Sequence, residues 1–191
     1  MITPTIGRGA AALRRFLRNR RGALLPEFAL AMPILILLSL GGLEVARYVL
    51  LHQKLDRVAA TLGDLTAQAE TLTVQEMDNL FEAVSYVLRP FEMGANGTVI
   101  VTAISASGGG GPQVDWQRAG GGNYPATSVF GTAGGVAALP TGFVVRDGES
   151  LVVAEVFYSY APWVAGGVTA ASELYTRALF RPRFGAIASL N

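Results

Sequence analysis

The sequence has no cysteine, a single histidine, His52, and a single lysine, Lys54, among its 191 residues. Without cysteine there can be no disulfide bond, iron–sulfur cluster or thiolate zinc site. One histidine without a second nitrogen or sulfur ligand makes a poor metal site or activating base, so we expect His52 to be solvated or packed at an interface. Charge is also scarce: charged residues make up 15% of the chain and hydrophobic residues 51%. This balance indicates that part of the chain lies outside water.

Two glycine runs, Gly108–Gly111 and Gly120–Gly122, lack the features of a phosphate-binding loop. Because the chain has one lysine, no Gly-Lys-Ser/Thr sequence is available to hold a nucleotide, and we interpret both runs as surface loops. No spacing that prescribes a catalytic pair is found among the acids Asp115, Asp147, Glu149 and Glu155. We therefore predict that the protein is not an enzyme and takes no cofactor or metal.

The positive charge is concentrated at the start of the chain. Residues 1–22 contain no acid and six arginines, which are Arg8, Arg14, Arg15, Arg18, Arg20 and Arg21. The remaining residues carry nine basic and fourteen acidic side chains. Such a leader could bind nucleic acid, but an apolar run follows it directly, and we expect no nucleic-acid partner.

The apolar run covers residues 23–43, in which Glu27 is the only ionisable residue. As a helix its 21 residues reach roughly 30 Å, enough to cross the apolar core of a bilayer. The positive-inside rule then places residues 1–22 in the cytoplasm and residues 44–191 on the other side. Two alternatives are a buried core helix and a secretory signal cleaved near Ser39-Leu40-Gly41.

An apolar stripe continues the helical pattern beyond the apolar run. Its members follow one another at alternating steps of three and four residues: Tyr48, Leu51, Leu55, Val58, Leu62, Leu65, Ala69 and Leu72. The spacing predicts one continuous helix from about residue 27 to about residue 72, with an amphipathic second half. The stripe either packs against the protein's own globular domain or against neighbouring subunits.

Three residues of the apolar run require a physical explanation. Glu27 would cost a few kcal/mol in lipid unless it is paired, and its alternative is to extend toward the interface beside Arg20 and Arg21. Pro26 is tolerated if it lies in the first turn of the helix. Pro33 lies inside the helix, where it removes one hydrogen bond and permits a kink or local unwinding.

The sequence Arg20-Arg21-Gly22-Ala23-Leu24-Leu25-Pro26-Glu27-Phe28 and the apolar run after it resemble the processing region of type IV-pilin-like precursors. The most similar group is the TadE/TadG-like minor pilins, or pseudopilins, of the tight-adherence (Tad, or Flp) pilus system. The resemblance implies that a prepilin peptidase cuts after Gly22, so that Ala23 becomes the N-terminus. It also implies that Glu27, the fifth mature residue, pairs with the freed amine of a neighbouring subunit during assembly. Phe28 stands where the major pilins of the system usually have tyrosine.

The C-terminal third extends the resemblance. Its strand-like sequence Leu151–Tyr160, the following Ala161-Pro162 and the later Arg181-Pro182-Arg183 are similar to the corresponding parts of TadE-like domains. Residues 73–148 show no such similarity.

The remaining elements predict an α+β fold. A second amphipathic helix is expected at Val74–Arg89, ended by Pro90. Strands are expected at Thr98–Ser105, Gln113–Ala119, Leu151–Tyr160 and Tyr175–Arg181, with Phe143–Arg146 as a hairpin strand or a tight lead into the third. Three to five antiparallel strands would pack on the second half of the long helix, giving a pilin-like lollipop.

The expected domain organisation has four parts. They are a cytoplasmic basic prepilin leader at 1–22, a transmembrane helix half at 23–43, the amphipathic continuation and second helix at 44–90, and a globular β domain with glycine-rich loops at 91–191. We expect core packing for most aromatic residues of the last part, and Trp163 to be exposed after Pro162.

The resemblance implies a structural subunit that primes or caps a Tad pilus used for adhesion. Its partners would be the prepilin peptidase, the other minor and major pilins, the inner-membrane assembly platform and the lipid bilayer. The location would be the bacterial inner membrane, with a single pass and a periplasmic C-terminal domain, and pilus association after processing. The alternative is an uncleaved, membrane-anchored binding module outside the cytoplasm; an anchored enzyme is a more distant one.

Overall fold

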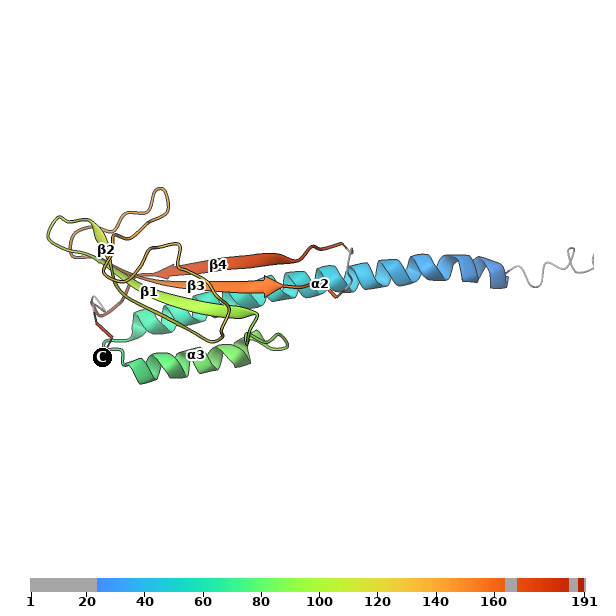
Figure 1. The fold of residues 1–191 in the computed structure, drawn as a ribbon, viewed down its shortest axis with the longest axis horizontal. Helices are drawn as coiled ribbons and strands as arrows, with labels where there is room; N and C mark the ends of the chain where they lie inside the picture. The colour runs from blue at the N-terminus through green and yellow to red at the C-terminus, as the bar shows by residue number, and fades with distance from the viewer. Residues whose placement is uncertain (1–23, 164–167, 186–188, 191) are drawn as a thin grey trace, which may run out of the picture. The chain divides into compact units, whose positions relative to one another are not determined.

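The computed structural model describes residues 24–163, 168–185 and 189–190 (Figure 1). Its elements are α2 (Leu24–Gln68), α3 (Val74–Leu88), β1 (Gly97–Ala106), β2 (Pro112–Gly120), β3 (Ser150–Tyr160) and β4 (Ser172–Phe180). The predicted α+β class, with a long N-terminal helix and a small antiparallel sheet, is confirmed. The chain divides into two compact units, residues 1–43 and residues 44–191.

In the first unit, the described residues form the apolar half of α2. Pro26 lies in the first turn, where its missing N–H has no intrahelical partner to lose. Pro33 lies inside the helix, which continues without interruption through this position.

In the second unit, α2 buries most of the predicted stripe against the protein's own domain, with Leu51, Leu55, Val58 and Leu62 in the core. The helix ends at Gln68, four residues earlier than predicted. The reason is the start of the next helix, because Thr73 caps α3 and must adopt an extended backbone to do so. Leu72 is still buried, although it lies in the connecting segment.

Helix α3 begins with a capping box and ends before Pro90. The Thr73 hydroxyl accepts a bond from the Glu76 backbone N–H at 3.2 Å, and the Glu76 carboxylate accepts one from the Thr73 N–H at 2.9 Å. The apolar face of α3 buries Met77, Phe81, Val84 and Leu88. The predicted helix at Val74–Arg89 is therefore confirmed, apart from its last residue.

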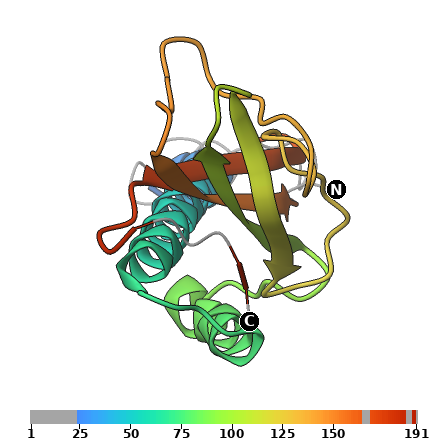
Figure 2. The same ribbon diagram turned by 90° about the vertical axis from the view of Figure 1, so that its left-hand side faces the viewer.

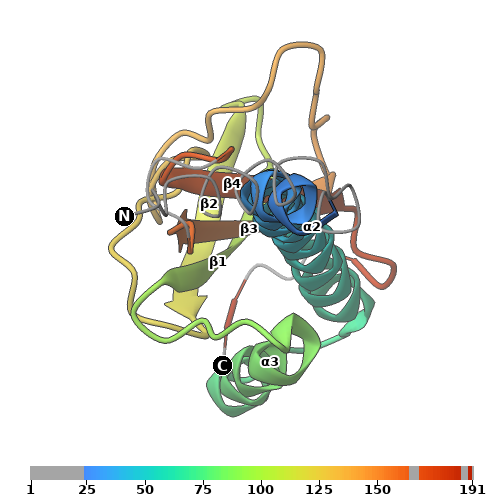
Figure 3. The same ribbon diagram turned by 90° about the vertical axis from the view of Figure 1, so that its right-hand side faces the viewer.

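The four strands form one antiparallel sheet in the order β2-β1-β3-β4. Both helices of the second unit lie on the same side of this sheet (Figures 2 and 3). Close approach of α2 requires Gly63, because an added Cβ would lie 2.6 Å from the Phe180 ring. Alternate residues of the central strands, such as Val99, Val101, Ala154 and Val156, form the core with the two helices.

The other side of the sheet is covered by the long connection between β2 and β3. Phe130, Ala137 and Val145 of this connection join Ile104 and Val153 of the sheet in a second cluster of buried residues. Residues 143–146 lead into β3 and form no strand. The predicted hairpin strand at this position was wrong and the alternative, a tight lead, was right, because the chain folds over the sheet here instead of extending its edge. The last strand begins at Ser172, three residues before the predicted one.

Candidate functional site

The apolar half of α2 exposes side chains that a water-soluble protein would bury. Leu25, Leu30 and Leu37 are exposed to 78%, 77% and 70%. In the most apolar 18-residue window the mean hydropathy is 2.1 and 6% of the residues are buried. A core helix of a soluble domain is mostly buried, so this alternative does not fit. Among the described residues, α2 is the one helix long and apolar enough to cross a membrane.

The predicted processing residues Gly22 and Ala23 lie outside the described residues. The predicted assembly residues Glu27 and Phe28 lie at the start of α2, and both are exposed. Glu27 falls in the first turn, where the unpaired backbone N–H groups and the helix dipole favour a negative charge. The fold thus contributes part of the stabilisation that a carboxylate needs at the end of an apolar segment.

Glu44, the first residue after the apolar run, is buried although it is charged, with 2% of its surface exposed. Its carboxylate accepts hydrogen bonds from the Tyr160 hydroxyl and from the Trp163 backbone N–H at 3.1 Å. The Thr169 hydroxyl lies 3.4 Å away. These partners come from the end of β3 and the connection to β4, so Glu44 joins the start of the second unit's part of α2 to the end of β3.

Arg47, one turn further along α2, completes this cluster. Its guanidinium donates to the Ala161 carbonyl at 3.1 Å and lies 3.9 Å from the Glu44 carboxylate. The guanidinium carbon lies 4.5 Å from the centre of the Trp163 ring and 5.5 Å from that of Tyr160, distances typical of cation–π contacts. We call Glu44, Arg47, Tyr160, Trp163 and Thr169 the exit cluster.

Glu44 and Arg47 directly follow the apolar run in the sequence, but the sequence analysis did not predict the exit cluster. Its other members follow more than one hundred residues later, and no local pattern links the two segments. The exposure of Trp163 was predicted and is confirmed at 68%. His52 is partly buried one turn from the cluster, with its ring centre 4.5 Å from that of Tyr48.

A second buried carboxylate, Glu155, lies on the sheet face covered by the β2–β3 connection. It is fully buried and accepts bonds from the Ser128 hydroxyl, the Val129 N–H at 3.0 Å and the Tyr175 hydroxyl at 3.0 Å. Burial and the neighbouring Glu155 charge raise the pKa of Tyr175 to about 12. Because two of these three partners, Ser128 and Val129, belong to the β2–β3 connection, Glu155 holds this connection to the sheet.

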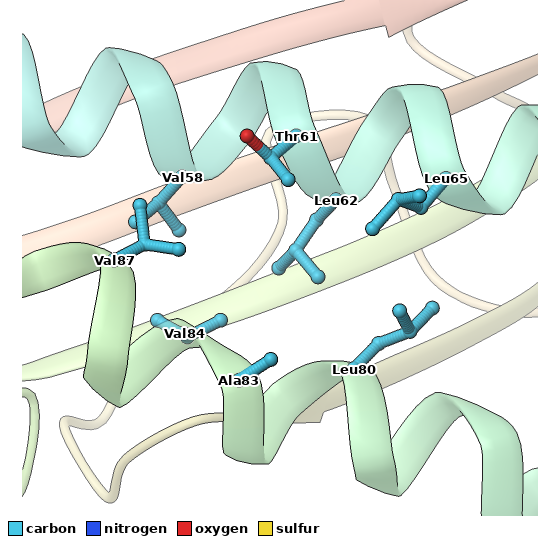
Figure 4. A pocket seen from close by; sticks show the side chains of 8 residues that line it. All are labelled: Val58, Thr61, Leu62, Leu65, Leu80, Ala83, Val84 and Val87. Carbon is cyan, nitrogen blue, oxygen red and sulfur yellow. The ribbon is translucent and has the colours of Figure 1, made fainter.

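A shallow apolar groove runs between α2 and α3 (Figure 4). Leu65, the one stripe residue that remains largely exposed at 44%, lies on its rim near Leu80. The other lining residues are Val58, Thr61, Leu62, Ala83, Val84 and Val87. In the described part of the chain, no group of three or more His, Asp or Glu residues is placed to hold a metal ion.

Comparison with known proteins finds a family match for the segment that contains the apolar half of α2, Glu44 and Arg47. Residues 22–62 match the family described as TadE-like protein. The match begins at Gly22 and ends within the buried half of α2, so the TadE-like segment includes Glu27, Phe28, Glu44 and Arg47. Neither the curated proteins nor the solved structures include a match to this chain.

The match covers 41 of the 191 residues, so it describes the N-terminal helical segment and not the whole chain. The exposed apolar helix of this segment suggests anchoring in a membrane. The four-stranded sheet lies outside the matched residues.

Proposed function

We propose that this protein is a minor pilin or pseudopilin that takes part in priming or capping a Tad-type pilus used for adhesion. The supporting observation is an exposed apolar helix that runs directly into a buried amphipathic one, within a TadE-like match that starts at Gly22. In this proposal the precursor spans the inner membrane once, with residues 1–22 in the cytoplasm and residues 44–191 in the periplasm. A prepilin peptidase removes the leader, and the helix then enters the pilus through the assembly platform, beside other minor and major pilins.

Glu27 would determine how the subunit is placed among its neighbours. A carboxylate in hydrocarbon is costly unless an opposite charge offsets it. Cleavage after Gly22 would create such a charge as the amine of Ala23, and Glu27 of one subunit would pair with that amine on another. Phe28 is 60% exposed next to it and would pack against the neighbouring apolar helix.

The mass of the mature chain tests processing. In cells with an active prepilin peptidase we expect the loss of residues 1–22 and an N-terminus at Ala23. Cells without the peptidase provide the control and should retain the leader. An intact N-terminus in both strains would exclude the prepilin assignment.

Substitution of Glu27 tests assembly. Glu27→Ala should abolish or strongly reduce incorporation into pili while the amount of protein stays near the wild-type level, because residues 44–191 contain the core. Ser39→Ala is a matched control, since it removes another polar group from the same apolar run, and should assemble normally. Full incorporation of the Glu27→Ala protein would refute the role of this carboxylate.

One observation favours a second function, an uncleaved membrane-anchored binding module. Glu27 lies in the first turn of α2, where the helix N-terminus stabilises a carboxylate without any partner subunit. In that case the leader remains attached, Glu27→Ala has little effect, and no pilus component copurifies after crosslinking. The mass measurement and the Glu27→Ala experiment therefore separate the two functions.

A further inference from the structure

Two large apolar side chains between β3 and β4 are exposed. Trp163 is 68% exposed and Val168 is 70% exposed. A tryptophan ring buries a large apolar area in a contact, while its N–H needs a hydrogen-bond acceptor. Tryptophan therefore favours sites where an apolar environment meets water. The contacts of Trp163 indicate which kind of partner can bury its exposed ring.

Trp163 is fixed to the first turn of the helix beyond the apolar run. Its backbone N–H donates to the Glu44 carboxylate at 3.1 Å, and the Arg47 guanidinium lies 4.5 Å from its ring centre. The carbonyl of Ala161, two residues before Trp163, accepts a bond from Arg47 at 3.1 Å. The backbone N–H and the ring of Trp163 are therefore both held by residues of α2.

These contacts set the depth of Trp163 relative to the bilayer. The apolar run ends at Leu43 and has the length of the hydrocarbon core. Glu44, the next residue, therefore marks the interface between hydrocarbon and headgroups. A backbone group within hydrogen-bond distance of Glu44 lies at the same depth, where tryptophan is enriched in membrane proteins.

We propose that Trp163, with Val168, inserts into the interfacial region of a phospholipid bilayer while the protein is membrane-anchored. The partner is a lipid surface, and the exit cluster holds the indole at the depth where the helix leaves the hydrocarbon. This inference depends on the membrane span of the proposed function but not on cleavage or pilus assembly. It gives the outer domain a second contact with the bilayer, which must break before the subunit leaves the membrane.

Tryptophan fluorescence of the full-length chain in phosphatidylcholine vesicles tests the proposal. The chain has two tryptophans, and the other one, Trp116, is buried in the core at 8% exposure. The Trp163→Phe protein is the matched control, because it keeps a ring beside Arg47 and leaves only Trp116 to emit. Lipids brominated near the headgroup should quench a large part of the wild-type emission and little of the control emission. Iodide in the buffer should quench Trp163 less in vesicles than in the urea-unfolded chain.

Two results would overturn the proposal. Equal quenching of the wild-type and Trp163→Phe proteins by shallow bromines would show that Trp163 does not touch lipid. Bromine quenching that is weak at a high protein-to-lipid ratio and increases as the protein is diluted with more lipid would show that another copy of the protein covers Trp163. Alkaline extraction of the vesicles tests the membrane span separately. A chain that resists extraction but is not quenched refutes only the lipid contact of Trp163. A chain that is extracted refutes both the membrane span and the lipid contact.

Discussion

Two buried carboxylates within residues 44–191 are stabilised mainly by hydrogen-bond donors. Glu155 is fully buried and accepts bonds from two hydroxyl groups and one backbone N–H. Glu44 is bonded in a similar way and has Arg47 nearby. Because a buried polar group is costly without partners, each carboxylate makes its surrounding segments fold together.

We expect Glu155→Ala to destabilise the protein by about 3 kcal/mol, since three donors would lose their acceptor in a buried site. Glu155→Gln keeps one carbonyl acceptor and should cost less. Denaturant unfolding of both proteins in detergent measures the two free energies. Equal stability of Glu155→Ala and wild type would show that the β2–β3 connection is held without this residue.

The raised pKa of Tyr175 predicts that the protein loses stability at high pH. Its pKa is raised from 10.0 to about 12, chiefly by burial and then by the Glu155 charge. Between these values the folded protein binds a proton that the unfolded chain has released, so this contribution is complete below pH 10 and falls as the pH rises toward 12. Tyr175→Phe has no such proton and should show a weaker decline in unfolding temperature over this interval. An identical decline in the two proteins would contradict the assignment.

Single residues were predictable where a local pattern determined them. The exposure of Trp163 follows from its position after Pro162 at the end of a strand. Core packing was expected for most of the other aromatics, and Trp116, Phe130, Tyr158 and Tyr160 are buried, whereas Tyr124 is half-buried. The burial of Glu155 was not predictable. Its covering segment, residues 121–149, has no periodic pattern, so the sequence does not indicate that this segment buries one face of β3.

At the scale of elements, α3 depends on its N-terminal cap. Thr73→Ala removes the hydroxyl that accepts the Glu76 N–H and should lower the free energy of unfolding by about 1 kcal/mol. Thr73→Ser retains the hydroxyl and serves as the control. Thermal unfolding of the three proteins checks this, and a Thr73→Ala protein as stable as Thr73→Ser would show that tertiary packing alone fixes the start of α3.

Helix and strand interiors were predicted well, whereas ends were not. The three-and-four spacing identified α2, but it continued through Ala69 and Leu72, which lie beyond the helix. Leu72 is buried for a different reason, because the connecting segment also packs into the core. Apolar spacing indicates which residues are buried and does not distinguish a helix from a packed extended segment that follows it.

At the scale of the whole molecule, composition predicted the contrast between an exposed apolar helix and a globular α+β domain. The strand order β2-β1-β3-β4 could not be predicted. Only β1 and β2 are joined by a short turn, whereas β2 and a long connection separate β1 from β3, and a longer segment joins β3 to β4. The exit cluster depends on that order, since it requires the end of β3 to lie beside Glu44.

Residues 44–191 should fold without the apolar half of α2, because both clusters of buried residues lie within this part of the chain. A fragment of residues 44–191 is expected to be folded, with a cooperative thermal transition measured by circular dichroism. A fragment of residues 53–191 is the matched comparison: it lacks Glu44, Arg47 and the fully buried Leu51, and the loss of a buried leucine alone costs about 2–5 kcal/mol. It should therefore unfold at a much lower temperature or show no transition. Equal unfolding temperatures of the two fragments would mean that residues 44–52, and the exit cluster they help to form, add nothing to the stability of the domain. The folded domain would then begin further along the chain than Glu44.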